Sequence, residues 1–116
     1  MRTLVLLLAF STAVFGQKVH TLCQACHSEQ VSDFLQHPHA EKALSCDACH
    51  GASAKHREAS GGAPPDKVAG PQEVPALCGG CHSAQLKQFQ PSKHSQILAA
   101  AGRVKAPNCG TCHGVH

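Results

Sequence analysis

All eight cysteines of this 116-residue chain fall into four copies of one pattern, Cys-x-x-Cys-His. Two thiols at this spacing can each form a thioether with one vinyl group of a haem, while the adjoining imidazole reaches the iron. The cysteines predicted to carry haem are Cys23, Cys26, Cys46, Cys49, Cys78, Cys81, Cys109 and Cys112. The predicted proximal iron ligands are His27, His50, His82 and His113. The pattern therefore predicts four covalently bound c-type haems.

The same eight cysteines have three alternative uses: a disulfide framework, two zinc sites, or thioredoxin-like redox pairs. None of these uses requires a histidine directly after the second cysteine. With 10 histidines in 116 residues, four such histidines arise by chance on the order of once in twenty thousand. The haem interpretation is therefore favoured, with zinc ribbons as its main competitor.

Six further histidines lie outside the motifs and could complete the coordination of the four irons. Methionine is the other common sixth ligand of haem iron, but the one methionine of the chain is Met1, which we expect to leave with an export signal. The candidate distal ligands are His39, His56, His94 and His116, with His20 and His37 as reserve candidates. Every predicted haem can therefore bind two imidazoles.

An internal duplication singles out two of these histidines. Aligning Cys23 with Cys78 also pairs His39 with His94 without a gap. The two halves are therefore predicted to be the same supersecondary unit, each with two haem motifs. Because His39 and His94 share both position and context, they are the strongest candidates for distal ligands.

The sequence around each of the remaining candidates indicates a different role for it. His37 aligns with Ser92, so capping of a helix is its simpler role. His56 and His116 each follow the second motif of their unit. The three residues that separate His116 from its own motif histidine span at most about 10 Å, so His116 should reach a neighbouring haem. A frayed terminus is its alternative role, and His20 could serve the first haem or a haem of another protomer.

The secondary structure is expected to be short helices in irregular chain. Pro38 is placed to begin a helix that runs to about Ser45, and Ser92 to cap a helix over residues 93–101, ended by Gly102. Preceding helical turns are predicted over residues 28–35 and 83–89, with Phe34 and Phe89 against a porphyrin. We therefore expect a small all-α protein, mostly irregular, with two dihaem units wrapped around four stacked haems and no significant β-sheet.

The N-terminus predicts export. Arg2 precedes an apolar run over residues 4–15, with a cleavage site expected after Gly16. The run is too short to span a bilayer, and an uncleaved interfacial anchor is the alternative. The mature chain should be periplasmic or extracellular, without a transmembrane segment. The expected division is a signal peptide (1–16), a first dihaem unit (17–59), a Gly/Pro-rich linker that acts as a spacer (60–76) and a second dihaem unit (77–116).

Composition limits both the core and the partners. The mature chain keeps Phe34 and Phe89 as its aromatic residues, so the haems must supply much of the apolar interior, and the haem-free chain should be largely unfolded. The formal charge of +3 falls to +2 when Arg2 is removed, and four ferric haems bring it to about −2. Without a Lys/Arg cluster, nucleic-acid binding has no support.

Each half resembles the doubled Cys-x-x-Cys-His unit of multihaem cytochromes c. In that pattern a Phe and a Ser-x-His lie between the two motifs, and Gly follows the second. Here it runs from Cys23 to Gly51 and from Cys78 to Gly114, with His37 in place of the usual serine. The resemblance implies an exported bacterial or archaeal electron-transfer protein with closely stacked haems.

Two imidazoles on each iron leave no position for a substrate and give a lower potential than His/Met ligation. We therefore expect an electron carrier, not an enzyme, between a quinol-oxidising membrane donor and a terminal reductase, another multihaem cytochrome or an extracellular acceptor. The alternative is a homo-oligomeric filament in which His20 and His116 complete haems of neighbouring subunits. A reductase with one open haem is disfavoured, because histidines outnumber the vacant positions.

Overall fold

The computed structural model describes residues 20–101 and 106–116 of the chain. The predicted signal peptide (1–16), Gly102 and the side chain of His20 lie outside this description. The described part contains nine α-helices and no strand, which confirms the expected helical fold without a sheet. The helices are α1 (His20–Cys23), α2 (Ser28–Leu35), α3 (Pro38–Glu41), α4 (Asp47–His50), α5 (Ala54–Glu58), α6 (Val74–Gly79), α7 (Ser83–Phe89), α8 (Lys93–Ala100) and α9 (Cys109–His113). None of these helices is long and apolar enough to cross a membrane.

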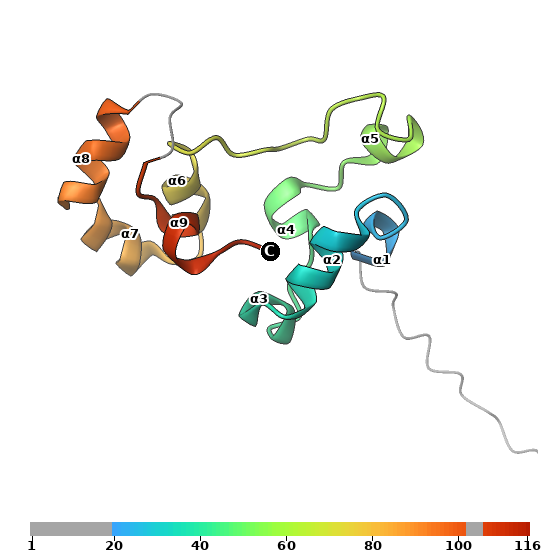
Figure 1. Ribbon diagram of the computed structural model, residues 1–116, viewed down its shortest axis with the longest axis horizontal. Helices are drawn as coiled ribbons and strands as arrows, with labels where there is room; N and C mark the ends of the chain where they lie inside the picture. Colours follow the sequence, from blue (N-terminus) through green and yellow to red (C-terminus); the bar gives the residue numbers. More distant parts are fainter. Residues whose placement is uncertain (1–19, 102–105) are drawn as a thin grey trace, which may run out of the picture.

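The helices form two groups with the same order. Helices α1 to α4 belong to the first half of the chain and α6 to α9 to the second. Helices α2 and α7 both begin at the serine that follows the first motif of their half. In Figure 1 the two groups lie apart, joined by an extended segment, and the C-terminus returns to the space between them. The order of the helices in the two halves therefore agrees with the duplication seen in the sequence.

The helices that carry His39 and His94 begin as predicted. Helix α8 starts at Lys93, and the hydroxyl of Ser92 accepts a hydrogen bond from the backbone N–H of Ser95 at 3.2 Å. Helix α3 starts at Pro38, with His37 as its N-cap. His39 and His94 therefore each lie in the first turn of a short helix.

The predicted length of α3 is wrong, because the helix ends at Glu41 and does not reach Ser45. Ala43 has φ 58°, in the left-handed region that ends helices. The backbone N–H of Leu44 bonds to the carbonyl of His39 at 3.1 Å, as in a Schellman turn. The chain is thus turned back toward the second motif earlier than the sequence indicates.

Glycines end the helices of the second motif in each half. Gly51 follows α4 with φ 71°, and Gly114 follows α9 with φ 69°. A side chain is strained in this backbone region, which glycine adopts freely. Gly79 has a different role, since a Cβ atom there would collide with Leu86 and force α6 away from α7.

The apolar core is small. The buried apolar residues in the described part of the chain are Val31, Phe34, Pro75, Leu98 and Ala106. Large apolar side chains that remain at least 40 % exposed are Leu22, Leu35, Leu44, Val68, Ile97 and Val115. Burial of one such side chain contributes about 1.5 to 3 kcal/mol, whereas fixing each backbone residue costs about 1 to 2 kcal/mol. The protein atoms alone therefore bury too little apolar surface to hold nine short helices together.

The linker is irregular over residues 60–73, as expected, but α6 already begins at Val74, inside the predicted linker range. Its second part is bound to the second unit. The amide of Gln72 donates to the carbonyl of Leu98 at 3.3 Å, and that of Asn108 donates to the carbonyl of Pro71 at 3.2 Å. Its first part is bound to the first unit, as described below. The expectation of a plain spacer is therefore wrong.

Candidate functional site

A helical turn holds each Cys-x-x-Cys-His motif. In the first three motifs the backbone N–H of the histidine donates to the carbonyl of the first cysteine, at 3.0, 2.9 and 2.9 Å. The fourth motif forms α9, whose start is fixed by a capping box between Asn108 and Thr111. In every motif the first cysteine is half-buried and the second is exposed, and all eight are free thiols within the described residues. The four motifs thus present their thiols in the same way.

The first cysteines of the two motifs in each half lie together. The thiols of Cys23 and Cys46 are hydrogen-bonded, as are those of Cys78 and Cys109. Burial raises the pKa of Cys23, and Cys46 raises it further. Burial likewise raises the pKa of Cys78. The neighbouring Cys109 raises it further, and Cys49 of the other half has a smaller effect in the same direction. The attachment points therefore adjoin in chain order, from the first motif to the fourth.

Three of the four motif histidines lie beside a histidine from outside the motifs, with the ring planes roughly parallel. The pairs, with the distance between ring centroids and the angle between ring planes, are His27 with His56 (6.0 Å, 20°), His39 with His82 (6.0 Å, 30°) and His50 with His116 (6.2 Å, 32°). All three outer histidines are among the predicted distal ligands. In the structure each of them lies beside one particular motif histidine.

The spacing of these pairs suits two imidazoles on one metal ion. A bond of about 2 Å from the metal to each ring nitrogen places the centroids of two opposed rings about 6 Å apart. A porphyrin supplies four nitrogens, so its iron needs two protein ligands, whereas zinc takes three or four. Within the described ranges, no three His, Cys, Asp or Glu side chains form a potential metal site. Pairs of histidines therefore fit haem iron better than they fit zinc.

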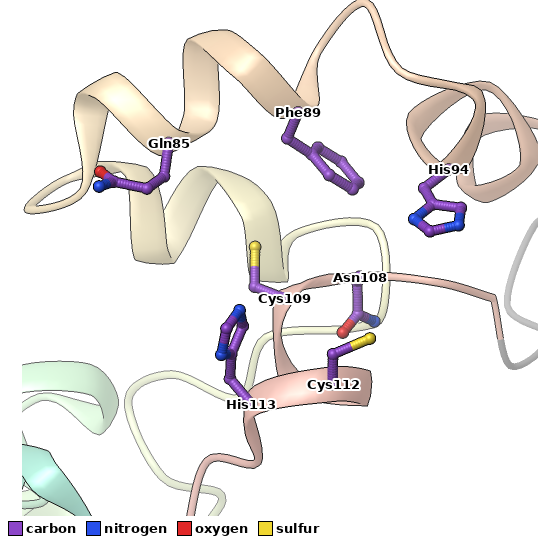
Figure 2. Close-up of a pocket in the computed structure, with 7 residues that line it drawn as sticks. All are labelled: Gln85, Phe89, His94, Asn108, Cys109, Cys112 and His113. Atoms are coloured by element: carbon purple, nitrogen blue, oxygen red, sulfur yellow. The ribbon is translucent and has the colours of Figure 1, made fainter.

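The fourth motif histidine lines a pocket together with the fourth predicted distal ligand. The pocket has a volume of about 200 Å³ and is lined by Gln85, Phe89, His94, Asn108, Cys109, Cys112 and His113. Figure 2 shows Phe89 and His94 on one side of it and the side chains of α9 on the other. It is smaller than the roughly 300 to 1,000 Å³ of pockets that enclose a small ligand. A haem held by these cysteines would therefore leave part of its edge in solvent.

Hydrogen bonds define the protonation of two paired histidines. Nδ1 of His50 lies 2.9 Å from the carbonyl oxygen of Lys67, and Nδ1 of His56 lies 2.7 Å from that of Ala63. Because a carbonyl oxygen can only accept, both Nδ1 atoms carry the proton. In a neutral ring with its proton on Nδ1, Nε2 keeps the lone pair that a metal ligand requires.

His37 has the opposite arrangement. Its Nδ1 accepts a hydrogen bond from the backbone N–H of His39 at 3.3 Å, so its proton is on Nε2. The expected capping role of His37 is thus seen, and its ring lies 4.7 Å from that of His39. Burial lowers the pKa of His39, and the neighbouring His37 and His82 lower it further. A lowered pKa favours the neutral imidazole that binds metal.

Two of the pairs cross between the halves. His39 of the first half lies beside His82 of the second, while His116 of the second half lies beside His50 of the first. The sequence predicted that His116 would reach a neighbouring haem, but it did not indicate that His39 and His116 would each lie beside a motif histidine of the other half. It also did not indicate Asp66, whose carboxylate accepts from the backbone N–H of Ser53 at 2.7 Å.

Comparisons of the chain with protein-family models, with curated proteins and with solved structures found no match. Any function must therefore be argued from the motifs and from the geometry of the histidine pairs.

Proposed function

We propose that the protein is an exported carrier of electrons that binds four c-type haems, each between two histidines. The observation that carries the proposal is that three motif histidines each lie beside a second histidine, while the fourth, His113, lines a pocket together with His94. Bound haems supply reversible one-electron chemistry. The protein would supply the attachment, the axial ligands and the surroundings that tune the reduction potentials of the haems.

Each haem would be held by one motif and one outer histidine. The proposed axial pairs, from the first motif to the fourth, are His27 with His56, His50 with His116, His82 with His39, and His113 with His94. The cysteines of each motif would fix the porphyrin edge by thioether bonds. The exposed apolar side chains, such as Leu22 and Leu35, would then have porphyrin to pack against.

This coordination favours a carrier over a reductase. A multihaem reductase needs an iron with a free position for its substrate. Here three motif histidines lie beside a second imidazole, and His113 shares its pocket with His94. The same geometry favours a carrier over a filament protomer, because His116 lies beside His50 of the same chain and needs no neighbouring subunit.

The proposed partners are redox proteins: a quinol-oxidising membrane donor on one side, and a terminal reductase, another multihaem cytochrome or an extracellular acceptor on the other. The attachment points adjoin in chain order, which supports one continuous row of haems between two docking ends. Export would precede assembly. N-terminal sequencing of the mature protein should give Gln17 as its first residue, and retention of Met1 would contradict removal of the signal.

Carbon monoxide binding tests the coordination. The reduced holoprotein should bind almost no carbon monoxide, because in the proposed coordination histidines would fill both axial positions of each iron. As a positive control, the variant His94→Ala should bind carbon monoxide at about one haem in four. Binding by most haems of the unmodified protein would refute the carrier proposal.

A further inference from the structure

The first part of the linker contacts two of the histidines that would hold the first two haems. The carbonyl of Ala63 accepts from Nδ1 of His56, and the carbonyl of Lys67 accepts from Nδ1 of His50. His56 is paired with the first motif and His50 belongs to the second. One short stretch of backbone therefore holds one axial ligand of each haem in the first half.

A separate set of hydrogen bonds anchors this stretch. The carboxylate of Asp66 accepts from the backbone N–H of Ser53 at 2.7 Å, and the hydroxyl of Ser53 accepts from the backbone N–H of Asp66 at 3.1 Å. The same hydroxyl donates to the carbonyl of His50 at 3.0 Å. Ser53 is 8 % exposed, so the anchor lies partly out of water. Asp66 is thus tied directly to Ser53, which precedes α5, and through the hydroxyl of Ser53 to the end of α4.

The backbone around the anchor leaves little room for another arrangement. A Cβ atom on Gly51 would meet the Cβ and Oδ2 atoms of Asp66 at 3.0 Å. Pro64 and Pro65 connect Ala63 to Asp66, and each proline ring fixes its own φ near −65°. Movement of Asp66 would therefore move both carbonyls that hold the histidines.

No such contact is seen among the described residues of the second half. In the described part of the chain, no backbone carbonyl accepts from the rings of His82, His94 or His113. Donation from Nδ1–H to a carbonyl makes the other ring nitrogen a stronger donor to the metal. A stronger donor stabilises ferric over ferrous iron and so lowers the reduction potential.

The geometry points to Asp66 as a positioning residue that holds the carbonyls of Ala63 and Lys67 on His56 and His50, and so lowers the potentials of the first two haems below those of the last two. This inference rests on the proposed function, since it needs the four bis-histidine haems. The difference in potential would give electron transfer a direction, because electrons that enter at the first half would be held preferentially in the second.

The test is a redox titration of the complete four-haem protein and of three variants. Asp66→Ala removes the anchor, and Asp66→Asn keeps an oxygen that can accept from Ser53 but removes the charge. Asp33→Ala removes an exposed carboxylate of α2 and serves as the control. Haem content and the low-spin state are measured first in every sample. Fewer than four low-spin haems in the unmodified protein would refute the proposed function and not the role of Asp66.

With four low-spin haems present, Asp66→Ala should raise the two lowest potentials, each by about a tenfold change in the reduction equilibrium, which is about 59 mV for one electron. The two highest potentials should stay in place, as should all four in Asp33→Ala. In Asp66→Asn the two lowest potentials should stay close to those of the unmodified protein. In the ferrous protein, nuclear magnetic resonance should show faster solvent exchange of the Nδ1 protons of His50 and His56 in Asp66→Ala.

Two results would overturn the inference. One is a set of four unchanged potentials in Asp66→Ala. The other is an equal shift in Asp66→Asn and Asp66→Ala, which would assign the effect to the lost charge and not to the position of the linker.

Discussion

His39 and His94 occupy the same place in the two halves of the chain but lie beside different partners. Each is the second residue of a short helix that follows a capping side chain. His94 shares a pocket with His113 of its own half, whereas His39 lies beside His82 of the other half. Equivalent local structure therefore does not give equivalent coordination.

The difference has a consequence for the whole molecule. Because His39 is directed to the second half, His50 is left for His116, which comes from the end of the chain. The two middle haems would each draw their axial ligands from both halves. Under the proposed function, this exchange makes the halves one cooperative body instead of two linked dihaem modules.

Removal of haem should have the largest effect on both halves. Protein produced without haem attachment should lack a cooperative thermal transition, because so few apolar residues are buried among the described residues. Circular dichroism during heating, compared with the four-haem protein, measures this. A native-like helical spectrum with a cooperative transition in the haem-free chain would contradict the expectation.

Removal of the two equivalent histidines should open different haems. His39→Ala and His94→Ala should each convert about one haem in four to the high-spin state. Double variants locate that haem by non-additivity. His39→Ala should disturb no further haem when combined with His82→Ala, but a second haem when combined with His50→Ala.

The matched control is the same series on His94. There, His113→Ala combined with His94→Ala should disturb no further haem. If His39→Ala proved additive with His82→Ala and silent with His50→Ala, the halves would be equivalent and the exchange would be wrong.

Loss of the terminal histidine tests the second half of the exchange. His116→Ala should also give about one high-spin haem in four, and carbon monoxide should bind to it. The contact with His50 at 6.2 Å is the reason. Four low-spin haems in this variant would instead mean that His116 is a frayed terminus or that another histidine serves the second motif.

The caps of the two equivalent helices should have the smallest effects. Ser92→Ala removes the side-chain cap of α8, at a cost of about 1 kcal/mol in the free energy of unfolding. His37→Ala removes the longer, 3.3 Å cap of α3 and should cost less. Chemical denaturation measures the loss of stability in both variants. Spectroscopy should show that both keep four low-spin haems. A high-spin haem in His37→Ala alone would give His37 a role as ligand.

The sequence predicted those features that depend on residues close together in the chain, namely the motifs and the starts of two helices. Residue type and spacing were enough for the motifs, and Ser92 and Pro38 were enough for the starts of α8 and α3. The end of α3 was missed, since Ala43 adopts a left-handed conformation that its residue type does not favour.

The partners of the histidines could not be predicted, because they depend on how distant segments meet. Nothing near His39 in sequence indicates His82, and nothing near His116 indicates His50. The linker is a similar case, since its composition suggested a spacer while Asp66 and two carbonyls bind the first half. These contacts are set by tertiary structure, on which local patterns carry no information.

Electron paramagnetic resonance of the oxidised holoprotein, with haem counted on the same sample as the pyridine haemochrome, tests the central claim most directly. The four histidine pairs predict four haems per chain, all of them low-spin. A high-spin fraction near one quarter, or a count below four haems, would contradict the account and direct the search to an open iron or to another use of the motifs.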